Sequence, residues 1–109
     1  MKTKLTGIDR LNIFEILPQK EGRIKMILIT EISDMLKITG EETVEFGLRD
    51  NPSGGILYNP EHPKLKADKE FDLKAPHIEV LKEAVIELDK KKAWTPQNKD
   101  TCIKIEKLK

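Results

Sequence analysis

Apolar residues in the first part of the chain recur at steps of three and four, which is the spacing of one face of an α-helix. The segment 6–9 reads TGID and has the form of a capping box, in which Thr6 accepts a hydrogen bond from the Asp9 amide. The apolar series that follows consists of Ile8, Leu11, Phe14 and Leu17. Because proline cannot continue a helix, we expect this first helix to end at Pro18.

A second helical series follows the turn at 19–22 and continues to about Ile38. Its expected buried face consists of Ile24, Ile27, Leu28, Ile32, Met35 and Leu36. In the first half, Ile24, Met26 and Leu28 also alternate as they would in a strand. The helical period nevertheless continues through the whole series, so the pattern favours a helix.

The middle of the chain consists of short pieces bounded by turn-forming residues. The segment 39–42 reads TGEE, a second capping box, and predicts a short helix that ends at Gly47. Two apolar pieces, 46–49 and 56–58, flank the turn-forming segment 50–55, which contains a proline and two glycines. This arrangement predicts a β-hairpin.

The last third begins with segment 70–73, whose alternation fits a third strand added to the hairpin. Pro76 is well placed in the first turn of a further helix, because its missing amide is not needed there. The apolar series of that helix consists of Ile78, Leu81, Val85 and Leu88. Three lysines at 90–92 suit its negative C-terminal end.

The segment 95–108 has two interpretations. Cys102, Ile105 and Leu108 would share one face of a helix, which is the interpretation that we favour. A strand through Ile103 and Ile105 is the alternative. Together, the elements predict one α+β domain over all 109 residues, with an N-terminal helix pair, a small antiparallel hairpin or three-stranded sheet, and a C-terminal helix pair.

The composition excludes several classes of protein. The chain has 20 Lys and Arg against 19 Asp and Glu, so its net charge of +1 fits neither a cationic nucleic-acid coat nor an acidic tail. The longest apolar runs, such as 26–29, contain four residues, so no segment is expected to span a bilayer. A single cysteine excludes a disulfide scaffold, and the start MKTK has no apolar stretch behind it, so we expect a cytoplasmic setting.

Residues that could carry chemistry are few. The two histidines, His62 and His77, and the carboxylates between them match no metal-ligand spacing. Cys102 has no histidine close in sequence, and we interpret it as a buried structural cysteine. Gly54 and Gly55 lack the spacing and the lysine of a phosphate-binding loop. We therefore expect no catalytic residue, no metal and no cofactor.

Charge is distributed unevenly along the chain. The net charge is +3 over residues 1–30, −4 over 31–50, −3 over 51–89 and +5 over 90–109. The acidic middle and the basic C-terminal segment would either form a partner surface or neutralise each other across the fold.

The candidate partner-binding residues lie at the junction between the last two helices. Trp94 follows three lysines there, and an indole in this position could anchor a protein partner or stack on a nucleobase. The interpretation that we favour is that it covers the end of the core. The candidate partner-binding residues are Lys90, Lys91, Lys92, Trp94 and Lys99.

The order of helix, helix, short helix and hairpin resembles a winged helix-turn-helix, with residues 46–58 as the wing. In that family the short third element reads the major groove of DNA. Here this element would present Glu41, Glu42 and Glu45 to the phosphates, and their charge disfavours DNA binding.

Several short segments resemble a group of short uncharacterised phage and prophage proteins. The segments read LPQKEG at 17–22, TGEE at 39–42, GILYNP at 55–60, LDK at 88–90 and TP at 95–96. The group shares a Leu-Pro turn that ends in glycine, a Ser/Thr-x-Glu-Glu helix start and a Trp/Tyr-Asn strand, and Tyr58 stands where Trp is common. The resemblance implies a phage or mobile-element origin and an accessory, host-interaction role.

We therefore expect a non-enzymatic module that binds another protein or a second copy of itself. The alternative is a nucleic-acid-binding protein, either winged-helix-like or acting through the basic C-terminal segment.

Overall fold

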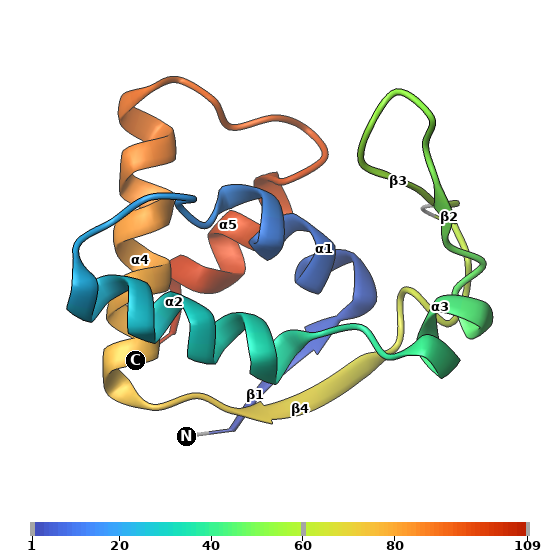
Figure 1. The fold of residues 1–109 in the computed structure, drawn as a ribbon, viewed down its shortest axis with the longest axis horizontal. Helices are drawn as coiled ribbons and strands as arrows, with labels where there is room; N and C mark the ends of the chain where they lie inside the picture. Colours follow the sequence, from blue (N-terminus) through green and yellow to red (C-terminus); the bar gives the residue numbers. More distant parts are fainter. Residues whose placement is uncertain (1, 60, 109) are drawn as a thin grey trace.

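The structure of the protein is a computed structural model that describes residues 2–59 and 61–108. Pro60, the last residue of the segment 55–60 that was compared with phage proteins, lies outside them. In chain order, the elements are β1 (Lys2–Thr6), α1 (Gly7–Ile16), α2 (Arg23–Leu36), α3 (Gly40–Glu45), β2 (Arg49–Asp50), β3 (Ile56–Leu57), β4 (Asp68–Asp72), α4 (Ala75–Lys90) and α5 (Lys99–Glu106). The α+β class is thus confirmed. Figure 1 shows α4 at one end of the molecule and α3 with the β2–β3 hairpin at the other.

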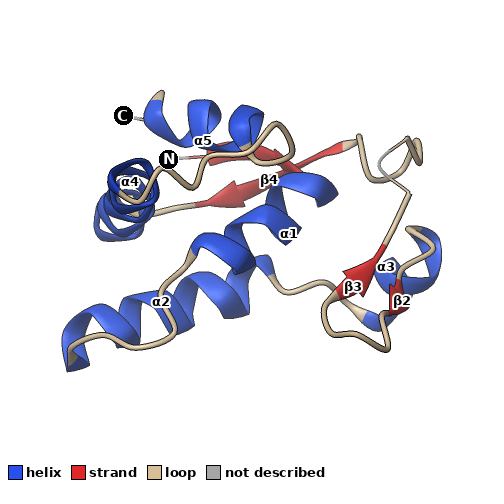
Figure 2. Cartoon of the chain, turned by 90° about the horizontal axis from the view of Figure 1, so that it is seen from above, coloured by secondary structure: helices blue, strands red, loops and turns tan. Residues whose placement is uncertain are grey.

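The main antiparallel sheet differs from the expected one. The β4 strand pairs with β1, in a register that sets Lys2 opposite Asp72 and Thr6 opposite Asp68, and it does not extend the hairpin. The expectation of a third hairpin strand was therefore wrong. The true partner of β4, the N-terminal strand β1, was not anticipated from the sequence. Only two of its five residues, Thr3 and Leu5, are buried, and so short an alternation does not identify a strand. Figure 2 shows the β1–β4 pair apart from the hairpin.

The hairpin itself is confirmed. Arg49 pairs with Leu57 and Asp50 with Ile56, so the strands have two residues each. Gly54 and Gly55 turn the chain with φ angles of 101° and 78°, which side chains with a Cβ rarely adopt.

Both predicted capping boxes are present. The Thr6 hydroxyl accepts from the Asp9 amide at 3.0 Å, and the Asp9 carboxylate accepts from the Thr6 amide at 3.0 Å. Thr39 and Glu42 repeat this arrangement at the start of α3, with 3.1 Å for both hydrogen bonds. The local sequence signal thus placed the first residue of both helices correctly.

The buried face of α1 is only partly the expected one. Leu11 and Leu17 are buried, whereas Ile8 and Phe14 are half-buried. The buried positions also include three polar residues, Asp9, Arg10 and Asn12. Apolar spacing could not indicate these residues, because they are buried through hydrogen bonds to distant segments of the chain.

Helices α2 and α4 pack side by side and run antiparallel. Lys25 near the start of α2 pairs with Glu83 in the second half of α4, and Glu31 further along α2 contacts His77 at the start of α4. The expected burial of Ile24 and Ile27 was wrong, because these side chains are 76% and 52% exposed. The buried positions of α2 are Ile29, Ile32 and Leu36.

The last helix closes the core. The segment Lys99–Glu106 is helical, which confirms the favoured interpretation over the strand. Cys102 and Ile105 are fully buried against the α4 face. Because α5 returns to the N-terminal part of the chain, it brings the two ends of the sequence together beside the β1–β4 sheet (Figure 1).

Candidate functional site

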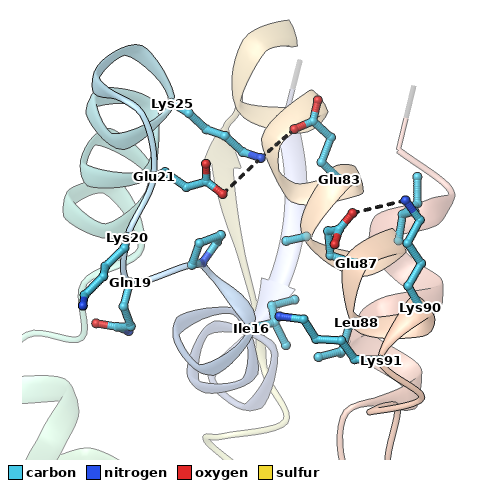
Figure 3. A pocket seen from close by; sticks show the side chains of 13 residues that line it. Ile16, Gln19, Lys20, Glu21, Lys25, Glu83, Glu87, Leu88, Lys90 and Lys91 are labelled. Atoms are coloured by element: carbon cyan, nitrogen blue, oxygen red, sulfur yellow. Dashed lines mark hydrogen bonds and ion pairs between the residues drawn. The ribbon is translucent and has the colours of Figure 1, made fainter.

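A cleft of about 610 Å³ lies between the turn that joins α1 to α2 and the second half of α4 (Figure 3). On the side of the turn it is lined by Ile16, Pro18, Gln19, Lys20, Glu21 and Lys25. On the side of α4 it is lined by Glu83, Ala84, Ile86, Glu87, Leu88, Lys90 and Lys91. The cleft thus combines apolar side chains with charges of both signs.

The turn side of the cleft follows directly from local sequence. Helix α1 ends at Ile16, and Leu17 is buried and anchors the chain to the core. Pro18 has no amide to continue the helix, so the chain leaves the core and exposes residues 19–22. Helix α2 then begins after Gly22. The turn is consequently held at both ends while its polar side chains remain accessible.

One lysine joins the two sides of the cleft. The Nζ atom of Lys25 lies 2.9 Å from a Glu83 carboxylate oxygen on α4 and 3.6 Å from Glu21 on its own side. The hydrogen bond to Glu83 raises the pKa of Lys25 above its ordinary value, so this lysine stays charged. Figure 3 shows its amine between the two carboxylates. Lys25 is therefore neutralised within the cleft.

The remaining charges leave an excess of positive charge. Lys90 pairs with Glu87 at 3.3 Å. Within the described part of the chain, Lys20 and Lys91 form no ion pair, and both are exposed. Figure 3 shows Lys20 on the side of the turn and Lys91 on the side of α4. The walls of the cleft therefore carry two free, exposed lysines, one on each side, and the amine of Lys20 is turned away from α4 in Figure 3.

Apolar side chains form the floor between these lysines. Ala84 is buried, and Ile16, Pro18 and Leu88 are half-buried. A ligand side chain that covered them would remove apolar surface from water, at about 25 cal/mol for each Å². The cleft can therefore hold an apolar group flanked by anionic groups, since the free ammonium groups would pair with carboxylates.

The structure separates the five residues selected from the sequence. Lys90 and Lys91 line the cleft, whereas Lys92, Trp94 and Lys99 do not. Lys92 is exposed and has a φ of 54°, in the left-handed region, two residues after the last residue of α4.

Trp94 is half-buried and packs against the core. Its indole N–H donates to the Val85 carbonyl oxygen at 3.4 Å. This arrangement agrees with the interpretation that Trp94 covers the end of the core. Lys99 is exposed at the start of α5.

The two histidines have separate environments. His62 lies in the loop before β4, where its Nδ1 accepts from the Lys64 amide at 3.2 Å. His77 is buried at the start of α4, where its Nε2 lies 3.1 Å from a Glu31 carboxylate oxygen. Within residues 2–59 and 61–108, no group of three His, Cys, Asp or Glu side chains is placed to hold a metal ion.

Cys102 is fully buried, and burial raises the pKa of its thiol above the ordinary value. A raised pKa keeps the sulfur in the protonated form, which is a poor nucleophile. The structure therefore favours the structural interpretation of this cysteine.

A polar network between α1 and α5 was missed by sequence reasoning. Thr101 donates to Asp9 at 2.6 Å and accepts from Asn12 at 3.0 Å, and Lys104 also donates to Asp9. Burial alone would raise the pKa of Asp9, but hydrogen bonds from Lys104 and Thr101 lower it below its ordinary value. Both carboxylate oxygens of Asp9 accept hydrogen bonds, so the network fixes α5 against α1.

The cleft residues on the side of the turn were also missed. Neither Lys20 nor Lys25 belongs to a ligand-binding motif, and only the exposed turn that follows Pro18 indicates an accessible segment. Their partner surface on α4 lies more than fifty residues further along the chain. No sequence spacing could therefore bring them together.

None of the helices in the described part of the chain is long and apolar enough to cross a membrane. Comparisons with protein-family models, with curated proteins and with solved structures find no match to this chain.

Proposed function

We propose that this protein is a non-enzymatic interaction module whose cleft holds an acidic and aliphatic segment of a protein partner. The observation that carries the proposal is the pair of free lysines, Lys20 and Lys91, on opposite sides of an apolar floor. Such a cleft complements a segment in which carboxylates flank an aliphatic side chain. Small phage or mobile-element accessory proteins of the host cytoplasm, as the sequence resemblance implies, would act through contacts of this kind.

Glutamates in the cleft favour a peptide over a nucleic acid. Glu21, Glu83 and Glu87 line the same walls as the lysines. A phosphate backbone is a continuous line of negative charge, and these carboxylates would repel it. A peptide segment, in contrast, can place single carboxylates opposite the two free lysines and an aliphatic group between them.

Selection from a random peptide library displayed on phage tests this proposal. We expect wild-type protein to enrich peptides that combine Asp or Glu with Val, Ile or Leu. The double variant Lys20→Glu/Lys91→Glu reverses both free charges and is expected to lose this enrichment. Both side chains are exposed and form no ion pair within the described residues, so the fold should not be affected.

The matched control is Lys64→Glu/Lys107→Glu, which changes the net charge equally at two exposed positions outside the cleft. It is expected to enrich the same peptides as the wild type. No enrichment on the wild type, or equal enrichment on the cleft variant, would refute the proposal. Fluorescence anisotropy with labelled duplex and single-stranded DNA at low salt tests the nucleic-acid alternative, and we expect no binding.

A further inference from the structure

Helix α3 presents a surface that complements the cleft. Glu41 and Glu45 are one helical turn apart and Val44 lies beside them, so the three side chains share one face. Val44 is 82% exposed, the highest value among the large hydrophobic side chains described. Within the described residues, neither glutamate forms an ion pair. Helix α3 thus offers an aliphatic side chain flanked by two free carboxylates.

This surface is held rigidly despite the short length of the helix. Thr39 and Glu42 form the capping box at its start, and Phe46 at its end is buried. The Glu42 carboxylate is also bound by the buried guanidinium of Arg10, at 2.6 Å. A surface that is already ordered loses little conformational entropy when it binds.

We propose that the cleft of one copy of this protein binds α3 of a second copy. Val44 of α3 would cover the apolar floor near Ala84 and Leu88, and its flanking glutamates would approach Lys20 and Lys91. This inference rests on the proposed function, since it identifies the partner of the same cleft. It is carried by charge complementarity: two free carboxylates around an aliphatic side chain meet two free ammonium groups around an apolar floor.

The positions of the two surfaces determine the type of assembly. Figures 1 and 2 show α3 and α4 at opposite ends of the molecule, whose longest extent is 33 Å, and the cleft lies against α4. One chain therefore cannot place its own α3 in its own cleft. Because the two surfaces differ, the contact is heterologous, and repeated head-to-tail contacts form open chains of molecules, or rings if the rotation between neighbours closes.

Sedimentation velocity of the wild-type protein at increasing concentration is the first measurement. We expect the average mass to increase with concentration at about 50 mM NaCl and to decrease strongly at about 500 mM NaCl, where exposed charges are screened. A strictly monomeric protein at low salt would overturn the inference.

Two variants test the contact itself. The cleft variant is Lys20→Glu/Lys91→Glu, and the α3 variant is Val44→Ser/Glu45→Lys; all four side chains are exposed, and circular dichroism checks the folds. In each variant alone, only one of the two complementary surfaces is intact. We therefore expect its self-association to be at least about tenfold weaker than that of the wild type, because the complementary charges are lost. The exposed-lysine control Lys64→Glu/Lys107→Glu should associate as the wild type does.

An equimolar mixture of the two variants gives the decisive result. The α3 variant retains an intact cleft and the cleft variant retains an intact α3, so the mixture should form a one-to-one dimer that grows no further. A mixture that remains monomeric, or a single variant that associates like the wild type, would overturn the inference.

The α3 variant also separates the two proposals. Its cleft is intact, so it should still enrich acidic and aliphatic peptides from the displayed library. If it does so while the wild type stays monomeric, the proposed function stands and self-association fails. If no variant and no wild-type protein enriches peptides, the proposed function fails as well.

Discussion

The guanidinium group of Arg10 binds the carboxylate of Glu42 through two hydrogen bonds, of 2.6 Å from Nη1 and 3.0 Å from Nη2. Arg10 is 2% exposed, and it also donates to the carbonyl oxygens of Leu36 and Lys37. Its guanidinium lies 5.3 Å from the centre of the Phe71 ring. One arginine thereby joins α1, the end of α2, the start of α3 and β4.

Replacing Arg10 by Met should strongly destabilise the protein. The substitution leaves the Glu42 carboxylate and two carbonyl groups without their donor, and breaking one side of a buried ion pair typically costs about 3–5 kcal/mol. Urea unfolding followed by circular dichroism measures this loss.

The control is Lys69→Met. Lys69 lies 3.9 Å from the same carboxylate but is 57% exposed, so the substitution should lower the stability by less than about 1 kcal/mol. Similar losses for both variants would contradict the structural role of Arg10.

Acid should destabilise the protein through Glu42. The hydrogen bond from Arg10 lowers the pKa of Glu42 from its usual 4.5 to about 2. Because the folded-state pKa is below the unfolded-state value, the stabilisation is complete above about pH 4.5 and is lost as the pH falls towards 2. The whole difference corresponds to no more than about 3 kcal/mol.

Urea unfolding between about pH 6 and about pH 2 measures this dependence. Glu42→Gln should be less stable than the wild type at pH 6 and should lose less stability as the pH falls. Glu45→Gln, at an exposed position, should retain the wild-type slope. An unchanged slope in Glu42→Gln would show that Glu42 does not carry the effect.

The Arg10 contacts explain why sequence reasoning described this helix only in part. The capping box of α1 depends on residues three positions apart, and it was predicted correctly. Arg10 itself contacts groups 26 to 32 residues further along the chain. A polar residue is generally expected at the surface unless its partner is known, so the apolar periodicity gave no indication that Arg10 is buried.

The same distinction applies to the sheet and to the cleft. The hairpin was predicted because its two strands and its glycine turn lie within ten residues of each other. The partner of β4 is β1, more than sixty residues earlier, and nothing in either five-residue strand identifies the other. Lys90 and Lys91 were selected as candidates from a local run of charge, but their counterpart Lys20 became recognisable only once α4 was placed beside the turn.

Thr101→Val should destabilise the contact between α1 and α5. Valine has nearly the same shape, so the change mainly removes the hydroxyl that donates to Asp9 and accepts from Asn12. Unsatisfied buried partners typically cost about 1–3 kcal/mol. Thermal and urea unfolding measure the loss. Thr30→Val is the matched control. Among the described residues, the exposed Thr30 hydroxyl bonds only to the Met26 carbonyl of its own helix, and we expect a change within about 0.5 kcal/mol. Equal effects of the two substitutions would argue against the network.

Two glycines at the first positions of helices should respond to alanine with opposite signs. A Cβ atom on Gly7 would lie 2.8 Å from Leu65 Cδ2 and 3.3 Å from Phe46 Cε2, and both neighbours are buried. The Gly7 amide also donates to the Leu65 carbonyl at 3.0 Å, so the two segments cannot easily separate. Overpacking of this kind costs about 1–3 kcal/mol, and the better helix propensity of alanine recovers only part of it.

Around Gly40, in contrast, a Cβ atom would meet no atom within 4 Å apart from its chain neighbours and the nearby backbone of its own helix. Gly40→Ala should therefore stabilise the protein by about 0.4–1 kcal/mol, because alanine restricts the unfolded chain. Urea unfolding of both variants under the same conditions measures the difference. If Gly7→Ala were as stable as Gly40→Ala, the close approach of α1 to Leu65 would not constrain this position. The packing among the buried side chains of Leu11, Phe46 and Leu65 would then have to be looser than the structure shows.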